Sequence, residues 1–464
     1  MLFGVKHESE NNIINSSLII LGIPMIQKRV APWGVSWRAF GFFCGDLKLE
    51  EGLEKQYIEK EKEERRRQNE EQHFNEILRT IHNHIAGEYS DAIEYKRAIS
   101  FCLDNNNEQT ILVFTPCGLG DYLLYRNFLR EIKSTAEYKE AKITLVLSDT
   151  LKTIAQQLDG DIVDEFYYLP KGIWNYSLKD QFVFLDGLFR DGLKRFFDTI
   201  IYGTNRYTLS NVTLYMQYNV CSKKSIITTG DLETRHVDEW QNNMFYTDVF
   251  SAVKPYEQFE FYNNRDYFEW ILHKNIVMPM HFIEDEKVPN VEICNKEYIA
   301  INVGAEENFR KWHNYNWSKL IRWIKENTKF AVVLIGAKSD ANDIEMINKL
   351  SGDNNLIVIG EKLINVAGII KNAKLYIGND SGCFHLAVSV KTKAICISSG
   401  NGYPRFVGYP ESNNYKILFG SGIKQYLKER LQKNPYDWRN FVAGVNLVSV
   451  DMVKEAAVDL LQNK

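Results

Sequence analysis

Short apolar runs, each ending in a glycine or a polar turn, recur along most of the chain and alternate with amphipathic segments. The first series of runs is Ile111–Thr115, Ile143–Leu147, Phe166–Leu169 and Phe197–Gly203. The second series is Tyr298–Gly304, Phe330–Gly336, Asn355–Gly360, Lys374–Gly378 and Lys393–Ser398. Buried strands that alternate with helices are typical of parallel sheets. The pattern therefore predicts an α/β protein with two doubly wound domains that face each other across a cleft.

The two series set the domain boundaries that we expect. An N-terminal extension occupies residues 1–100, a first α/β domain residues 101–288 and a second one residues 289–448. Residues 449–464 are predicted to form a helix that braces the two domains. A further helix is predicted around Asp238–Val253, in the aromatic-rich stretch between the two series.

The extension has two parts with different patterns. Leu18–Arg29 and Arg38–Leu49 each place glycine between apolar residues with basic residues close by, which predicts two short strands or a hairpin. The alternating charges of residues 50–71, continued by an apolar stripe to Ile85, predict an exposed helix, so the extension is α-rich. Residues 18–49 pack on the main body or contact a membrane surface or a partner. The helix packs on the first domain or on a second copy of the chain, which would make an oligomer.

Composition narrows the function classes. Lys and Arg number 56 and Asp and Glu number 60, so the net charge of −4 provides no field for nucleic acid. The seven cysteines are scattered without a Cys-x-x-Cys pair, which disfavours a zinc cluster and indicates a reducing compartment. No apolar run reaches the roughly 20 residues of a membrane span. We therefore predict a cytoplasmic protein, with the inner face of the cytoplasmic membrane as an alternative location.

The most specific candidate for chemistry lies within Ala373–Val390. A buried strand leads into a Gly-Asn-Asp-Ser-Gly turn and then into an apolar helix. Backbone N–H groups and the positive end of a helix dipole at the carboxyl end of a strand suit a phosphate. Asp380 and His385 flank this turn, and the alternative is a structural turn with a core histidine.

Three other turns also follow predicted strands. Gly118 and Gly120 permit a tight turn before Asp121, which is either a functional carboxylate or an ordinary helix cap. Arg310 and Lys311 suit a diphosphate, although an exposed basic pair is the alternative. Asp340 suits ribose hydroxyls or simply a solvated turn.

Several familiar motifs are absent or incomplete. The Gly118–Gly120 turn only half matches a dinucleotide fingerprint, because Leu123 stands where the third glycine belongs. Asp159-Gly160-Asp161 resembles a metal-binding triplet, but its polar surroundings predict a surface turn. No Gly-x-Ser-x-Gly elbow and no phosphate loop with Gly-Lys-Ser/Thr occurs, which argues against serine hydrolases and P-loop ATPases.

Together these motifs resemble glycosyltransferase family nine, the ADP-heptose lipopolysaccharide heptosyltransferases. The resemblance covers roughly Thr110–Ile132 and Tyr298–Pro410. Its parts are LVFTPCGLGDYLL, NVGAEENFRKWH with Arg310 at the family's Lys position, and the complete Gly-Asn-Asp-Ser-Gly-x-x-His-Leu-Ala signature at Gly378–Ala387.

The resemblance implies two Rossmann-like domains in the GT-B arrangement and inverting sugar transfer without a metal or cofactor. It assigns the catalytic base to Asp121 on the acceptor-side turn of Gly118 and Gly120. It assigns the nucleotide-sugar donor, an ADP-sugar as first choice, to Arg310, Lys311, Asp340, Asp380, Ser381, Gly382, Cys383 and His385.

Departures from the family keep the substrate open. Residues 1–100 have no counterpart in compact heptosyltransferases, and the loop Ser398–Pro410 differs from the usual Gly-Pro-Thr-Asp-Pro, so this loop is expected to select the sugar. Heptose is the first choice and another sugar the second. The acceptor is a lipopolysaccharide core, another cell-surface glycan, a glycolipid or a protein. The competing functions are a nucleotide-sugar epimerase of the same architecture and a non-catalytic scaffold that works through the extension.

Overall fold

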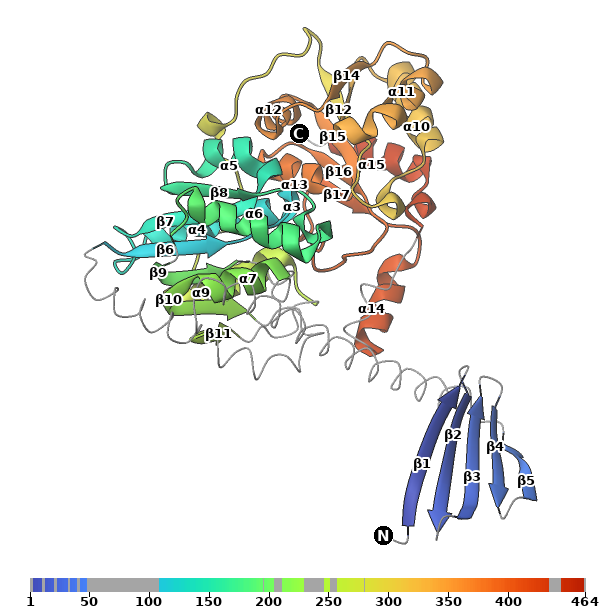
Figure 1. Cartoon of the computed structure of the whole chain (residues 1–464). Coiled ribbons are helices and arrows are strands. Elements are labelled where there is room, and N and C mark those ends of the chain that lie inside the picture. Colours follow the sequence, from blue (N-terminus) through green and yellow to red (C-terminus); the bar gives the residue numbers. More distant parts are fainter. Residues whose placement is uncertain are drawn as a thin grey trace. The chain divides into compact units, whose positions relative to one another are not determined.

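The computed structural model divides the chain into two units, residues 1–84 and 85–464 (Figure 1). It describes five strands within residues 3–47, and then residues 108–194, 196–203, 211–228, 246–250, 257–278, 280–433 and 444–462. In this part, no helix is long and apolar enough to cross a membrane.

The first unit contains an antiparallel five-stranded sheet in the order β1-β2-β3-β4-β5. Its strands are β1 (Phe3–Glu10), β2 (Ile13–Ile20), β3 (Ile23–Ala31), β4 (Gly34–Ala39) and β5 (Phe42–Leu47). The sheet is larger than the expected hairpin. The helix predicted over residues 50–85 lies outside the described residues, and so do the side chains on which a membrane contact would depend.

The second unit contains two parallel sheets of six strands. The first has the order β11-β10-β9-β6-β7-β8, so its first strand in the chain lies between its second and fourth. Its strands are β6 (Thr110–Phe114), β7 (Lys142–Ser148), β8 (Glu165–Leu169), β9 (Phe196–Tyr202), β10 (Cys221–Thr228) and β11 (Asp248–Phe250). Its helices are α3 (Leu119–Tyr125), α4 (Asn127–Lys133), α5 (Lys152–Asp159), α6 (Leu178–Arg190), α7 (Asn211–Asn219) and α9 (Glu260–Leu272).

The second parallel sheet repeats this topology as β14-β13-β12-β15-β16-β17. Its strands are β12 (Tyr298–Asn302), β13 (Ala331–Gly336), β14 (Leu356–Ile359), β15 (Leu375–Asn379), β16 (Ala394–Ile397) and β17 (Tyr415–Leu418). Its helices are α10 (Asn314–Asn327), α11 (Ala341–Leu350), α12 (Leu363–Lys371), α13 (Gly382–Ser389), α14 (Ile423–Lys433) and α15 (Val450–Gln462). This order is the doubly wound dinucleotide-binding topology, so the predicted fold of two Rossmann-like domains is confirmed.

Alternate residues of β12 show how helices cover both faces of the second sheet. Ile299 and Ile301 belong to a core that includes residues of α10, α11 and α15. Tyr298 and Ala300 point to the other face and belong to a core that includes residues of α12 and α13. Helix α15 contacts α10, β15, β16 and β17, so it packs on this sheet. Its predicted role as a brace between the two domains stays a prediction.

In the described part of the two parallel sheets, three strands were not expected from the sequence. They are β10, β11 and β17, and each contains polar or only partly buried positions. The helix predicted at Asp238–Val253 is wrong where the structure describes it, because Asp248–Phe250 forms strand β11 and pairs with β10.

The two sheets are joined through one apolar core. Helix α3 of the first sheet contacts helix α13 of the second, and the two lie side by side in Figure 1. Leu123 and Leu124 of α3 share a core with Phe384 and Leu386 of α13. The same core reaches both sheets, so the two domains are packed as one body at this contact.

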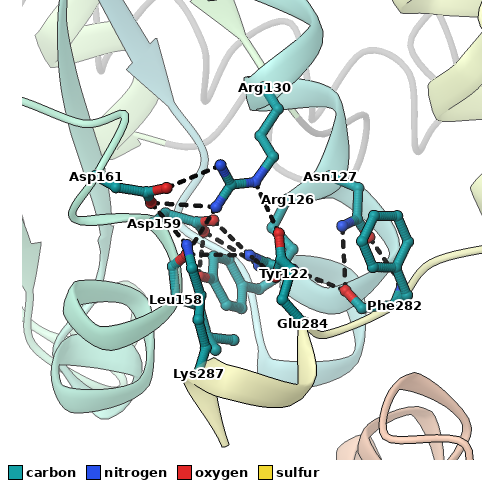
Figure 2. A network of polar contacts seen from close by, with 10 residues as sticks. All are labelled: Tyr122, Arg126, Asn127, Arg130, Leu158, Asp159, Asp161, Phe282, Glu284 and Lys287. Atoms are coloured by element: carbon teal, nitrogen blue, oxygen red, sulfur yellow. Dashed lines mark hydrogen bonds and ion pairs between the residues drawn. The ribbon is translucent and has the colours of Figure 1, made fainter.

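A buried ion pair fixes the segment that leads from the first domain to the second (Figure 2). Arg126 and Asp159 are completely buried and lie 2.7 Å apart, and Tyr122 donates a hydrogen bond to the same carboxylate. Arg126 also donates to the carbonyl of Phe282 at 2.8 Å. The expectation that Asp159 lies in a surface turn is therefore wrong.

The second carboxylate of the Asp-x-Asp triplet is also engaged. Asp161 pairs with Arg130 at 2.9 Å and with Lys287 at 2.7 Å, as Figure 2 shows. Both carboxylates thus hold cationic side chains that anchor residues 282–287. Among the described residues, no group of three or more His, Cys, Asp or Glu side chains could hold a metal ion.

Candidate active site

Candidate site residues of both domains follow strands at the same point of each sheet, where the strand order reverses. In each sheet, the strand order reverses between the first and fourth strands, and ligands of such sheets bind at the carboxyl ends beside this point. In the first domain β6 leads there into the turn of Gly118, Gly120 and Asp121. In the second domain β12 leads into the loop of Arg310, and β15 leads into Asp380.

The glycines at the contact of α3 and α13 bring these turns together. A Cβ on Gly120 would lie 2.8 Å from Cδ2 of His385, and a Cβ on Gly382 would lie 2.8 Å from Cβ of Leu119. Side chains at either position would collide with the other domain. The predicted acceptor-side turn and the predicted donor turn are therefore adjacent in space.

Asp121 lies in the first turn of α3 and is half-buried. Within the part of the chain that the structure describes, no hydrogen bond or ion pair engages its carboxylate. The neighbouring Cys117 is buried, and burial together with the charge of Asp121 raises the pKa of its thiol. The turn therefore presents the carboxylate of Asp121 beside a neutral thiol.

Asp380 is buried at the N-terminus of α13. Its carboxylate accepts a hydrogen bond from Ser398 at 2.9 Å. Burial raises its pKa, while Arg310 and Ser398 act in the opposite direction. Asp380 therefore holds the turn to the β16 loop and lies close enough to Arg310 to feel its charge.

Arg310 ends a short 3-10 helix, Asn308–Arg310, in the loop after β12. Asn379 fastens this loop to β15, because it donates to the carbonyl of Val303 at 2.7 Å and accepts from the amide of Trp312 at 3.1 Å. The buried Nε of Arg310 has no hydrogen-bond partner among the described residues. An unused cationic donor beside Asp380 is suited to an anionic ligand.

Lys311 points to a different set of groups. Its Nζ lies 3.2 Å from both Asp340 and Asp343. Burial lowers the pKa of Lys311, but the two carboxylates outweigh it and the pKa is raised overall. Two of the predicted donor residues, Lys311 and Asp340, are thus paired with each other, so the positive charge of Lys311 is already compensated.

Asp340 is held in the space next to Gly304. Its carboxylate accepts from the amide of Ala337 at 3.0 Å, and a Cβ on Gly304 would come within van der Waals overlap of it. Ser381 precedes α13 and donates to Asn302 at 3.3 Å. Burial raises the pKa of Cys383 to about 12, so this half-buried thiol is neutral.

A buried chain of side chains behind His385 was not predicted. Nδ1 of His385 lies 2.7 Å from the hydroxyl of Tyr409, and the same hydroxyl lies 2.7 Å from Nε2 of His281. Nδ1 of His281 lies 2.7 Å from the hydroxyl of Ser389. Burial, with Arg310 nearby, lowers the pKa of His385 to about 3, and burial also lowers that of His281. Both imidazoles are neutral.

The loop Ser398–Pro410, which was expected to select the sugar, is mostly buried and contacts the first domain. Arg405 pairs with Glu260 of α9 at 2.7 Å, and both side chains are buried. The amide of Glu260 also donates to the carbonyl of Arg405 at 2.6 Å. At these positions the loop fastens the domains together.

Comparison with known proteins identifies the second domain. Residues 273–436 match Glycosyltransferase family 9 (heptosyltransferase). This part of the chain is a glycosyltransferase family 9 domain. The predicted family and enzyme class, a glycosyltransferase, are thereby confirmed. No curated protein sequence matches the chain.

Solved structures of glycosyltransferases share the fold. A family 9 glycosyl transferase from Veillonella parvula is 16% identical with a TM-score of 0.55, covering 77% of this chain and 98% of that one. The E. coli heptosyltransferase WaaC with ADP-2-deoxy-2-fluoro heptose is 14% identical with a TM-score of 0.54, covering 76% and 99%. E. coli ADP-heptose LPS heptosyltransferase II is 15% identical with a TM-score of 0.52, covering 76% and 98%. At these identities the likeness establishes the GT-B fold of the two Rossmann-like domains.

Proposed function

We propose that this protein is an inverting, metal-independent glycosyltransferase that moves a sugar from a nucleoside-diphosphate sugar to a hydroxyl group of an acceptor. Heptose and ADP are our first choices for the donor. The acceptor is a lipopolysaccharide or another cell-surface glycan. The observation that carries the proposal is the contact between α3 and α13, because it unites the Asp121 turn with the turn of Asp380 and His385.

The bond changes follow from the chemistry of these groups. Asp121 takes the proton from the acceptor hydroxyl as that oxygen attacks the anomeric carbon of the donor sugar. The bond between this carbon and the diphosphate oxygen breaks, and the electron pair leaves with the nucleoside diphosphate. Attack opposite the leaving group inverts the configuration at the anomeric carbon.

Arg310 and the N-terminus of α13 supply positive charge for the departing diphosphate. The guanidinium offers a buried N–H donor that no described residue uses, and the first turn of α13 offers backbone N–H groups. In this proposal Asp340 and Lys311 shape the nucleotide side of the site as an ion pair, and Lys311 does not itself clamp the phosphates.

The proposal is tested by measuring sugar transfer and donor binding in the parent protein and in one variant. The full-length protein is screened by thermal shift against ADP-, GDP-, UDP- and CMP-sugars, and products with lipopolysaccharide acceptors are identified by mass spectrometry. Asp121→Asn should lower transfer by at least 100-fold, because removing general-base catalysis costs about 10²–10⁴-fold. Its affinity for the donor should stay within about threefold of the parent protein's.

The control is Glu140→Gln, which removes an exposed carboxylate from the same domain and should leave both quantities unchanged. Transfer by Asp121→Asn at the parent rate would exclude Asp121 as the base. An epimerised nucleotide sugar formed without acceptor would favour the epimerase instead. Failure of every nucleotide sugar to bind would contradict the proposed function as a whole.

A further inference from the structure

The hydrogen bonds behind His385 permit only one arrangement of protons. Ser389 donates its hydroxyl proton to the backbone carbonyl of His385 at 2.8 Å. The oxygen of Ser389 must then accept from Nδ1–H of His281, 2.7 Å away. A neutral imidazole has one donor and one acceptor nitrogen, so Nε2 of His281 is an acceptor.

The same reasoning passes through Tyr409 to His385. Because Nε2 of His281 accepts, the hydroxyl of Tyr409 donates to it at 2.7 Å. The oxygen of Tyr409 then accepts from Nδ1–H of His385, also at 2.7 Å. With its proton on Nδ1, the neutral His385 carries a lone pair and no proton on Nε2. Any other placement of these protons would leave two lone pairs or two protons facing each other in at least one of the four hydrogen bonds.

Nε2 of His385 faces the first turn of α3. It lies 3.2 Å from the point where a Cβ on Gly120 would stand, and Asp121 is the next residue. An unprotonated nitrogen cannot donate to a phosphate oxygen, but it accepts a hydrogen bond from a hydroxyl group. We propose that Tyr409 and His281 are positioning residues that hold His385 in its Nδ1–H tautomer, so that Nε2 accepts a hydroxyl of the transferred sugar.

This assignment rests on the proposed function for its ligand. It divides the donor between two groups of the second domain: Arg310 binds the diphosphate and His385 recognises the sugar. The donor sugar is favoured over the acceptor because His385 belongs to α13, the helix of the nucleotide half. It also gives the atypical loop that contains Tyr409 a role in sugar recognition without a direct contact to the sugar.

The first test reads the tautomer without any ligand. The protein is labelled with ¹⁵N in its histidine rings, and two-bond ¹H–¹⁵N correlations at pH 7.5 distinguish Nδ1–H from Nε2–H. His385→Gln assigns the signal. The parent protein should show Nδ1–H at His385, whereas Tyr409→Phe, which removes the acceptor of that proton, should shift it to Nε2–H. Nε2–H in the parent protein, or no change in Tyr409→Phe, would overturn the proposal.

The second test measures how much the sugar contributes to the affinity for the donor. In Tyr409→Phe, the affinity for the nucleotide sugar should fall about tenfold relative to that for the free nucleoside diphosphate, as expected for one hydrogen bond. Tyr298→Phe is the control, because it removes another buried tyrosine hydrogen bond, to the carbonyl of Ile369 at 2.6 Å, without touching this chain. A loss confined to KM for the acceptor would overturn the assignment to the donor sugar. Absence of nucleotide-sugar binding by the parent protein would count against the proposed function, while the tautomer result would stand.

Discussion

Gly120 is required by a side chain of the other domain. Its backbone does not adopt the left-handed region that favours glycine, so a tight turn alone does not explain it. The explanation is the imidazole of His385. A Cβ on residue 120 would lie only 2.8 Å from Cδ2 of this ring, which is too close for any side chain. Gly118 differs, since the nearest atom to its Cβ position is an oxygen of Asp121 at 3.9 Å.

This contrast gives a prediction with a matched control. Gly120→Ala should displace His385 and destabilise the folded state by about 1–3 kcal/mol, as overpacking of a core does. Gly118→Ala should change the free energy of unfolding by less than about 0.5 kcal/mol, because its Cβ meets only ordinary contacts. Urea unfolding measures both variants. Equal effects of the two substitutions would contradict the close approach of His385.

The two buried histidines predict how stability depends on pH. Burial lowers the pKa of both His281 and His385 below the usual 6.5. Below pH 6.5 the unfolded chain binds a proton on each residue, whereas the folded chain does not. Stability should therefore be full above pH 6.5 and fall towards pH 5, by about 1.4 kcal/mol per pH unit and histidine. The ordinary pKa of a carboxyl group lies below this window.

Urea unfolding at pH 7.5, 6.5, 5.5 and 5.0 checks this dependence. His281→Asn should be less stable than the parent protein at neutral pH. On acidification it should lose less stability, because only one of the two buried histidines remains to contribute about 1.4 kcal/mol per pH unit. A variant whose stability falls with the parent slope would show that His281 does not contribute.

At the scale of elements, the contact between the loop Ser398–Pro410 and α9 rests on a buried ion pair. Arg405 and Glu260 are 3% and 6% exposed, so solvent does not screen them. Glu260→Gln removes the carboxylate that pairs with the buried Arg405 and should lower the free energy of unfolding by about 3–5 kcal/mol. The double variant Glu260→Met, Arg405→Met should recover most of this loss, because both charges of the pair are replaced by apolar side chains. Thermal and urea unfolding of the three proteins provide the measurement, and an unstable double variant would argue against this interpretation.

The elements also show which parts of the fold a sequence can predict. Strands such as Ile111–Thr115 and Tyr298–Gly304 are apolar because both of their faces are covered, and their pattern is local. Strands β11 and β17 lie at the edges of their sheets and have half-exposed side chains, so their sequences contain no apolar run that would predict a strand. In the first unit, apolar residues around glycines indicated strands but not how many strands would pair.

In the candidate site, too, some residues could be predicted from the sequence and others could not. The turns with Asp121 and Asp380 were predictable because each lies at the end of a strand with a recognisable local motif. The chain from His281 through Tyr409 to His385 was not, since its members lie up to 128 residues apart and no motif contains them together. Asp159 was misjudged because its partner, Arg126, lies 33 residues away and withdraws it from solvent.

At the scale of the whole molecule, the apolar core has no boundary between the two Rossmann-like domains. One cluster of buried residues includes Ile111 and Val113 of the first sheet and Ala300 and Tyr376 of the second. The linking segment is held by the Arg126 network in addition (Figure 2). These contacts predict that the two sheets unfold in one cooperative transition.

Native-state hydrogen exchange with peptide resolution can test this in the full-length protein. Arg126→Met leaves Asp159 buried without its cation and should lower the free energy of opening by about 3–5 kcal/mol. If the domains form one cooperative unit, peptides from β6 and β7 and peptides from β12 and β13 should lose this protection equally. Arg130→Met is the control, because the side chain of Arg130 is 27% exposed and its ion pairs should contribute less than about 1 kcal/mol. A loss confined to β6 and β7 would mean that the second domain keeps its fold when the first one opens, and that the shared core does not couple them.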